Sequence, residues 1–79
     1  MEKHIEAFKE LILNGQRGGR FHLTTQSNNR LQLLFFKDKQ SDKFILQAYE
    51  GSHWLWSSHS ATRWILAKDF EKLINEYLW

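Results

Sequence analysis

Residues 30–37, RLQLLFFK, set the architecture of this 79-residue chain. The segment alternates polar and apolar residues in its first half, and from Leu33 to Phe36 it is apolar on both sides. Alternation with a period of two is typical of a β-strand. We therefore predict a strand at Arg30–Lys37, and its two apolar faces favour a central position in a sheet.

Shorter segments of the same kind surround this strand. We predict further strands at residues 20–25, 43–49 and 53–57, and a short, optional fifth strand at 63–66. The intervening segments, among them a turn at Gln26–Asn29 and one at Glu50–Ser52, are rich in Asn, Gly, Ser and Asp, which favour turns. Parallel neighbours would need crossovers of a dozen or more residues. Loops this short therefore predict an antiparallel meander.

The two ends of the chain have the period of an amphipathic helix. Near the N-terminus, Ile5, Phe8, Leu11 and Ile12 fall on one helical face, and Asn14-Gly15 is a typical helix end. Near the C-terminus the apolar positions are Phe70, Leu73, Ile74, Tyr77 and Leu78. Asp69 is the expected N-cap of that second helix.

Together these elements predict one α+β domain over residues 1–79, with a meander of four or five strands flanked by an N-terminal and a C-terminal helix. A chain this short needs dense packing, and 42% hydrophobic residues with four Trp, six Phe and two Tyr can supply it. The absence of cysteine favours a cytoplasmic protein. The N-terminal residues lack the apolar core of a signal peptide, and no segment is apolar enough to span a membrane.

Strand parity separates the expected sheet into two faces of different character. One face is apolar and is the expected core: Phe21, Leu23, Leu31, Leu33, Phe35, Phe44, Leu46 and Ala48, with Trp54, Trp56, Trp64 and Leu66. The other is half apolar and half polar or basic: Arg20, His22, Thr24, Arg30, Gln32, Leu34, Phe36, Lys43, Ile45, Gln47, Tyr49, His53, Leu55, Arg63 and Ile65. If both helices cover the first face, the second is open to a ligand. If one helix lies on each face, the second is ordinary core with a basic rim.

The basic residues gather in the same part of the chain. Between Gly15 and Lys43 there are six Lys or Arg residues and two Asp residues, although the net charge of the whole chain is only +2. Cations that follow phosphates beside aromatics that stack on bases are the means by which proteins hold single-stranded nucleic acid. We therefore expect a small, non-enzymatic module that binds nucleic acid, preferably single-stranded, or a nucleoprotein. The candidate binding residues are Arg17, Arg20, His22, Arg30, Phe36, Lys37, Lys39, Lys43, Tyr49 and Arg63.

A protein partner is the alternative, because aromatic residues and arginine are also typical of protein-binding hot spots. In that interpretation the chain is an inhibitor or adaptor that uses the apolar part of the sheet face or an edge strand. An accessory protein of a phage or plasmid, acting against a host defence system, belongs to this class. A homodimer is also compatible with a small, aromatic-rich chain.

The sequence contains no convincing catalytic or cofactor motif. The four histidines have no spacing typical of a metal site, and GQRGG at residues 15–19 lacks the Lys-Ser/Thr of a phosphate-binding loop. Ser57, Ser58 and Ser60 flank His59 without the pattern of a nucleophile elbow. We therefore expect no enzymatic activity, no metal and no cofactor.

Two resemblances of topology accompany these predictions. The order helix, strands, helix resembles double-stranded RNA-binding domains, but their Lys-Lys-x-Ala-Lys cluster is replaced here by Ala67-Lys68-Asp69-Phe70-Glu71-Lys72, so that assignment is rejected. The meander that ends in Trp64-Ile65-Leu66 and a helix is similar to the single-strand-binding domains of some transcriptional coactivators. This second likeness is one of topology over residues 20–79, with no shared motif.

Overall fold

The computed structural model describes the backbone of residues 2–25 and 27–78 and the side chains of residues 3–25 and 27–76. Gln26 of the expected turn, and the expected core side chains of Tyr77 and Leu78, lie outside these ranges. The elements are α1 (Glu2–Asn14), β1 (Gly19–Thr24), β2 (Arg30–Lys37), β3 (Phe44–Glu50), β4 (His53–Ser60) and α2 (Arg63–Leu78). The predicted α+β class is confirmed.

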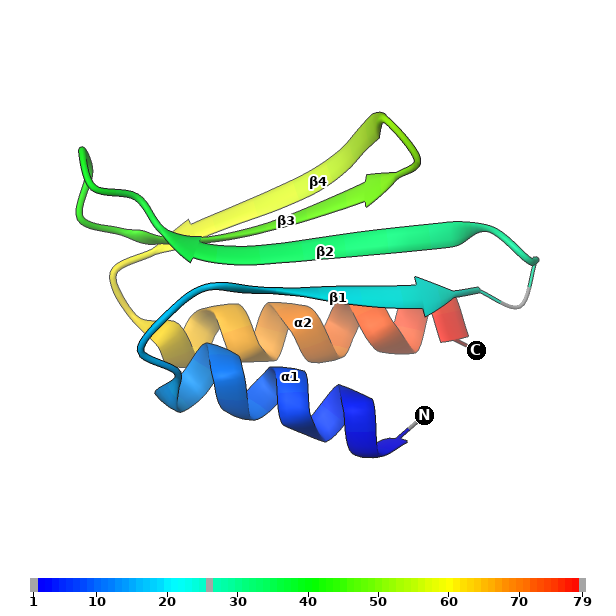
Figure 1. Ribbon diagram of the computed structural model, residues 1–79, viewed down its shortest axis with the longest axis horizontal. Helices are drawn as coiled ribbons and strands as arrows, with labels where there is room; N and C mark the ends of the chain where they lie inside the picture. Colours follow the sequence, from blue (N-terminus) through cyan, green and yellow to red (C-terminus); the bar gives the residue numbers. More distant parts are fainter. Residues whose placement is uncertain (1, 26, 79) are drawn as a thin grey trace.

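The four strands form one antiparallel sheet in the order β1-β2-β3-β4 (Figure 1). Each strand pairs with its neighbour in the chain, so the predicted meander is confirmed. β2 has the predicted bounds and is one of the two inner strands. The central position that its two apolar faces predict is therefore confirmed, because β2 lies between β1 and β3.

The optional fifth strand is wrong, because Arg63–Leu66 forms the first turn of α2. Leu66 and Ala67 are buried together with Phe70 and Ile74, which is the spacing of one helical face. The expected start of the helix at Asp69 is wrong for the same reason. Backbone hydrogen bonding begins near Thr62, whose carbonyl oxygen accepts from the Ile65 amide at 3.3 Å. Burial of Leu66 thus overrides the strand preference of Trp64 and Ile65.

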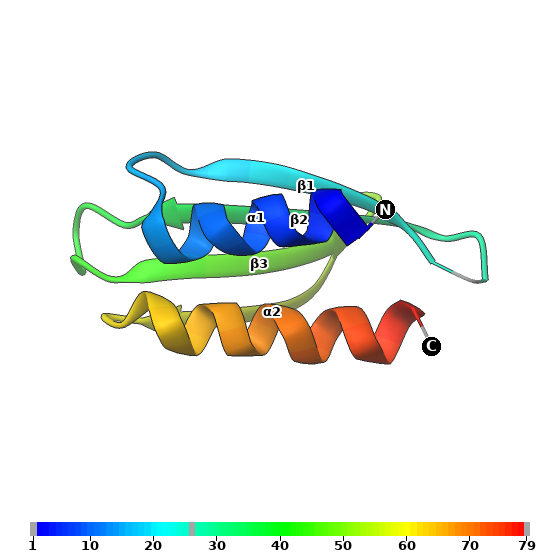
Figure 2. The same cartoon turned by 90° about the horizontal axis from the view of Figure 1, so that it is seen from below.

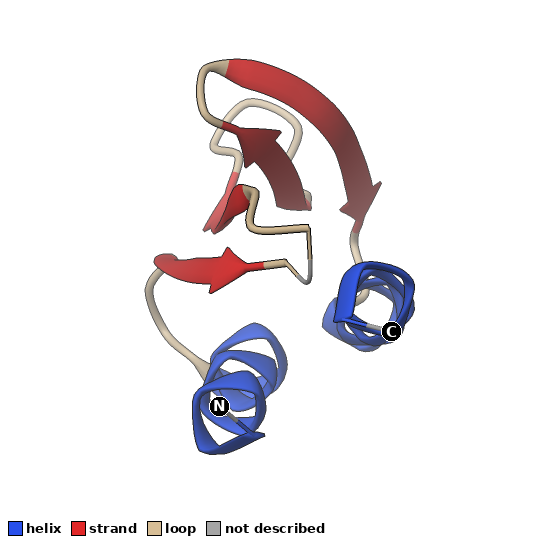
Figure 3. Cartoon of the chain, turned by 90° about the vertical axis from the view of Figure 1, so that its right-hand side faces the viewer, coloured by secondary structure: helices blue, strands red, loops and turns tan. Residues whose placement is uncertain are grey.

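Both helices lie on the same side of the sheet, as Figures 2 and 3 show from two further directions. α1 packs against β1, α2 packs against β3 and β4, and the two helices contact each other. Of the two arrangements compatible with the sequence, the one with a single covered face is therefore present.

The core lies between the helices and the covered face. Three phenylalanine rings meet at its centre: Phe8 of α1, Phe21 of β1 and Phe70 of α2, with centroid separations of 5.1–5.7 Å. Eight of the expected core residues are buried: Phe21, Leu23, Leu31, Leu33, Phe35, Leu46, Ala48 and Leu66. An ion pair between Lys9 and Glu71 joins the helices at the surface.

Strand β4 departs from the expected parity at a β-bulge. Tyr49 pairs with Trp54 while Ala48 pairs with Trp56, so Leu55 is an extra residue without a partner. Trp56 and Leu55 consequently pack against the core, whereas Trp54 is 53% exposed. The expected burial of Trp54 is therefore wrong, and so is the expected place of Leu55 on the other face. His53 pairs with Glu50 and also leaves that face.

Candidate nucleic-acid interface: the open sheet face

The sheet face opposite the helices is called the open face here. Directly paired residues of neighbouring strands point to the same face, so the register defines its members. They are Arg20, His22 and Thr24 of β1, Arg30, Gln32, Leu34 and Phe36 of β2, Ile45, Gln47 and Tyr49 of β3, and Trp54, Ser57 and His59 of β4. This set contains most of the mixed face that parity predicts.

One row of the open face crosses all four strands. His22 pairs with Gln32, Gln32 with Tyr49, and Tyr49 with Trp54. The Tyr49 hydroxyl donates a hydrogen bond to Oε1 of Gln47 at 3.3 Å, which restrains the phenol ring on the surface. The row thus carries two large aromatic side chains on adjacent strands, with one amide and one imidazole beside them.

A second row lies at the other end of the open face and is more apolar. Phe36 pairs with Ile45, and Ile45 with His59. Phe36 is half-buried and Ile45 is buried, although neither lies beneath a helix. These two side chains therefore offer less surface for stacking than Trp54 does.

The charges of the open face all have one sign. Arg20 and Arg30 are exposed there, and none of its side chains is a carboxylate. Residues 15–62, between the helices, contain six Lys or Arg and three Asp or Glu. The two helices together contain five Lys or Arg and six Asp or Glu. The sheet and its loops are accordingly the cationic layer of the molecule.

Two loops add cations at the Phe36 end of the sheet. Arg17 is exposed in the loop before β1, next to Gly18, where an added Cβ would collide with the Phe35 carbonyl oxygen. Gly18 thus lies too close to the backbone of β2 for any side chain to fit there. Lys39 and Lys43 are exposed in the β2–β3 loop.

Lys37 and Arg63, two other predicted binding residues, do not belong to the open face. The ammonium of Lys37 lies 3.0 Å from the Asp42 carboxylate and 5.6 Å from the Phe44 ring centroid. Arg63 is on α2, with its guanidinium 4.5 Å from the same ring. Phe44 packs against the core, so both cations lie toward the helix side. The expected position of Arg63 on the mixed face is wrong because its segment is helical.

Trp54 is the residue of this surface that sequence reasoning missed. Alternation along β4 placed it in the core together with Trp56. The position of Trp54 could have been predicted from the turn at Gly51 and Ser52. A two-residue turn pairs Glu50 with His53 and Tyr49 with Trp54. Counting outward from the turn would have given Trp54 the same face as Tyr49.

The β2–β3 loop is organised by Asp38. Its carboxylate accepts hydrogen bonds from the Ser41 hydroxyl at 2.7 Å and from the backbone amides of Gln40 and Ser41. The Ser41 hydroxyl is the largest cause that lowers the pKa of Asp38 below its ordinary value, because the bond favours the charged form. Lys39 and Lys43 are therefore held on an ordered loop.

Replacing Ser41 with alanine is expected to move the pKa of Asp38 back toward its ordinary value. Because the pKa of Asp38 is lowered in the folded protein, its charged form stabilises the fold at pH values above the unfolded pKa. This stabilisation is lost as the pH falls through the folded pKa. Carbon-13 titration of the Asp38 carboxyl group by NMR, in the wild type and in Ser41→Ala, measures the change. Identical titration curves would contradict the role given to Ser41.

The described part of the chain has neither a metal-site cluster nor a membrane-spanning helix. Within residues 2–25 and 27–78, no three His, Asp or Glu side chains gather as a metal site would require. None of the helices in the described part of the chain combines the length and hydropathy needed to cross a membrane. Comparison of the chain with family models, curated proteins and solved structures finds no match, so the open face is interpreted from its own geometry.

Proposed function

We propose that this protein binds nucleic acid, preferentially single-stranded, on the open face. The observation that supports the proposal is the position of both helices on the other face, which leaves Tyr49 and Trp54 on one uncovered face with Arg20 and Arg30 and no carboxylate. This function is compatible with the cytoplasmic location that the lack of cysteine favours.

The row of Tyr49 and Trp54 supplies the affinity that charge alone cannot. A base stacked on an aromatic side chain contributes about 1–3 kcal/mol, and any base can do so because each has a π-face. Neighbouring strands are about 4.8 Å apart, so the two rings can take adjacent unstacked bases. Paired bases in a duplex have no free faces, which is the reason for preferring single strands.

The arginines of β1 and β2 supply a contact for phosphates. Arg30 lies on β2, the strand next to Tyr49, and Arg20 lies on β1, while Lys39, Lys43 and Arg17 extend the positive charge around the Phe36 end. Contacts of this type release condensed counterions, so affinity should fall steeply with salt. The side-chain amides of Gln32 and Gln47, on the same face, can donate hydrogen bonds to the edges of the bases.

Substitution of Trp54 by alanine tests the stacking role. We expect Trp54→Ala to weaken binding of a fluorescein-labelled dT or U 12-mer by about 5- to 150-fold, measured by fluorescence anisotropy at low salt. Trp64→Ala is the matched control, because Trp64 is 57% exposed but lies on α2. The control should bind as the wild type does.

The outcomes separate the parts of the proposal. If neither oligonucleotide nor duplex binds at low salt, nucleic-acid binding is wrong. If a duplex binds as tightly as single strands and Trp54→Ala resembles Trp64→Ala, nucleic-acid binding stands but the stacking of single strands does not.

A further inference from the structure

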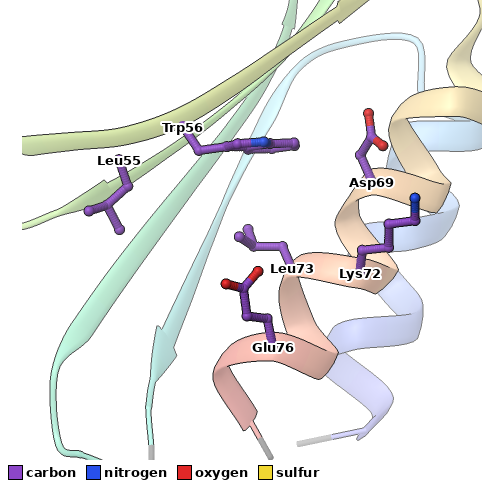
Figure 4. A pocket seen from close by; sticks show the side chains of 6 residues that line it. All are labelled: Leu55, Trp56, Asp69, Lys72, Leu73 and Glu76. Atoms are coloured by element: carbon purple, nitrogen blue, oxygen red, sulfur yellow. The ribbon is translucent and has the colours of Figure 1, made fainter.

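A cleft lies between β4 and α2, on the side of the molecule that the open face does not reach. Its volume is about 470 Å³, and its lining consists of Leu55 and Trp56 of β4 with Asp69, Lys72, Leu73 and Glu76 of α2. Figure 4 shows the Trp56 ring extending from β4 toward α2, and Leu73 and Glu76 extending from α2 toward β4. None of the candidate nucleic-acid residues lines it.

The lining combines an apolar wall with carboxylates. Leu55, Trp56 and Leu73 form the apolar part, and Asp69 and Glu76 place their carboxylates along the helix side. Oδ2 of Asp69 accepts a hydrogen bond from the Ser58 hydroxyl at 2.6 Å, which fixes this side chain beside the strand. With Lys72 included, the cleft has two negative groups and one positive group, and therefore favours a cationic side chain.

The strand beside the cleft is an edge of the sheet. β4 is the last strand in the order, so among the residues described it pairs with β3 alone and its other side has no strand partner. Natural edge strands are commonly protected by Lys, Pro or inward charges. Residues 56–60 of β4, WSSHS, contain no Lys, Arg, Asp, Glu or Pro, and the bulge at Leu55 lies before them. Beyond the bulge the edge can accept another strand.

We propose that β4 and the cleft together bind an extended peptide segment of a partner protein by strand addition. The backbone of the peptide pairs with the outer edge of residues 56–60, and alternate side chains point toward α2 into the cleft. Strand addition takes affinity from main-chain hydrogen bonds and specificity from pockets for alternate side chains. The peptide carries an apolar residue against Leu55, Trp56 and Leu73, and a Lys or Arg two residues away, about 6.7 Å, beside the Glu76 carboxylate, because Asp69 already accepts from Ser58.

This site is independent of the nucleic-acid proposal. The open face and the cleft lie on opposite faces of the sheet, so a nucleic acid and a peptide can bind to one molecule at the same time. The partner would thereby be brought to the bound nucleic acid.

A phage-displayed library of random nonapeptides, selected against the full chain, is the probe. We expect the selected peptides to be enriched in Lys or Arg two positions from an apolar residue. Titration of the synthesised peptides into nitrogen-15-labelled protein should shift the amides of residues 56–60 and the indole NH of Trp56. The same β4 amides should exchange more slowly with solvent once peptide is bound.

Charge variants on exposed α2 positions test the cleft without disturbing the core. Glu76→Lys should weaken binding of the selected basic peptides by about tenfold or more, and Lys72→Ala should tighten it. Glu6→Lys, the same charge change on exposed α1, is the matched control and should have no effect.

Three results would overturn the proposal. The first is a selection that enriches no peptide. The second is peptide binding that Glu76→Lys leaves unchanged or that shifts the amides of β1 and β2 instead of those of β4. The third is a dimer by analytical ultracentrifugation whose β4 amides are already protected without peptide, because the edge would then belong to a second copy of the chain.

Discussion

Replacement of Phe70 by alanine is expected to destabilise the protein by about 3–5 kcal/mol, the usual cost of removing a buried aromatic ring. Phe70 is 0% exposed, and its ring lies 5.1 Å from that of Phe8 and 5.7 Å from that of Phe21. The substitution therefore removes the ring through which α2 contacts both α1 and β1. The remaining structure cannot close the cavity without moving an entire helix.

A loss of this size is comparable to the whole stability of a small domain. At about 0.05–0.15 kcal/mol per residue, a chain of this length has a free energy of unfolding of roughly 4–12 kcal/mol. Urea denaturation followed by far-ultraviolet circular dichroism measures the loss, and for the variant we expect a much lower midpoint or a largely unfolded baseline.

The control for this substitution is Ile65→Ala on the same helix. Ile65 is 42% exposed, so its truncation should change the free energy of unfolding by less than about 0.5 kcal/mol. A Phe70→Ala variant that lost less than about 1 kcal/mol would contradict the place given to the three-ring cluster.

Reversal of both open-face arginines, in Arg20→Glu/Arg30→Glu, is expected to weaken single-strand binding by roughly a hundredfold or more. Each charge-assisted hydrogen bond is worth about 1.5–3 kcal/mol, and the reversal adds repulsion to the loss of two such contacts. Both side chains are exposed, so the fold should be little affected. Anisotropy titrations at several salt concentrations measure the affinity and its salt dependence.

The salt dependence adds a second readout. Loss of two phosphate contacts should reduce the slope of log affinity against log salt by about 1.4, at about 0.7 per contact for single strands. Lys3→Glu/Lys68→Glu changes the net charge equally but on the helices. Equal loss of affinity in both double variants would mean that overall charge, and not the open face, attracts the nucleic acid.

The two proposed binding surfaces lie on opposite faces, an arrangement that suits a small adaptor. The open face has cations and exposed aromatics, whereas the β4–α2 cleft has carboxylates beside an edge strand. The carboxylates of the cleft would repel a nucleic acid, and the arginines of the open face would repel a basic peptide. The separation of charge between the two layers thus keeps the proposed ligands apart.

Sequence periodicity by itself determined the local elements. Apolar spacing in α1, alternation in Arg30–Lys37 and the turn residues between strands are all properties of a few neighbouring residues, so they can be read without knowing the rest of the chain. Parity along β1, β2 and β3 likewise separated the buried face from the mixed face. These strands contain no bulge between the residues concerned, so the period of two holds throughout.

Tertiary packing decided the positions where that periodicity fails. Trp54 changed face because the bulge at Leu55 inserts one residue, and a shift of one residue reverses the face of every residue on the far side of it. Arg63 left the sheet because burial of Leu66 and Phe70 extends α2 toward its N-terminus. Both outcomes depend on distant residues that local patterns do not contain.

Only the tertiary structure decided which surfaces are available. Period-two alternation defines two faces of a sheet, but it contains no information on which face the helices cover. That choice depends on how α1 and α2 pack against each other and around Phe70, and it makes the mixed face an open one. The β4–α2 cleft has the same origin, because its two walls are separate in sequence and meet only through the packing of the helix beneath the edge strand.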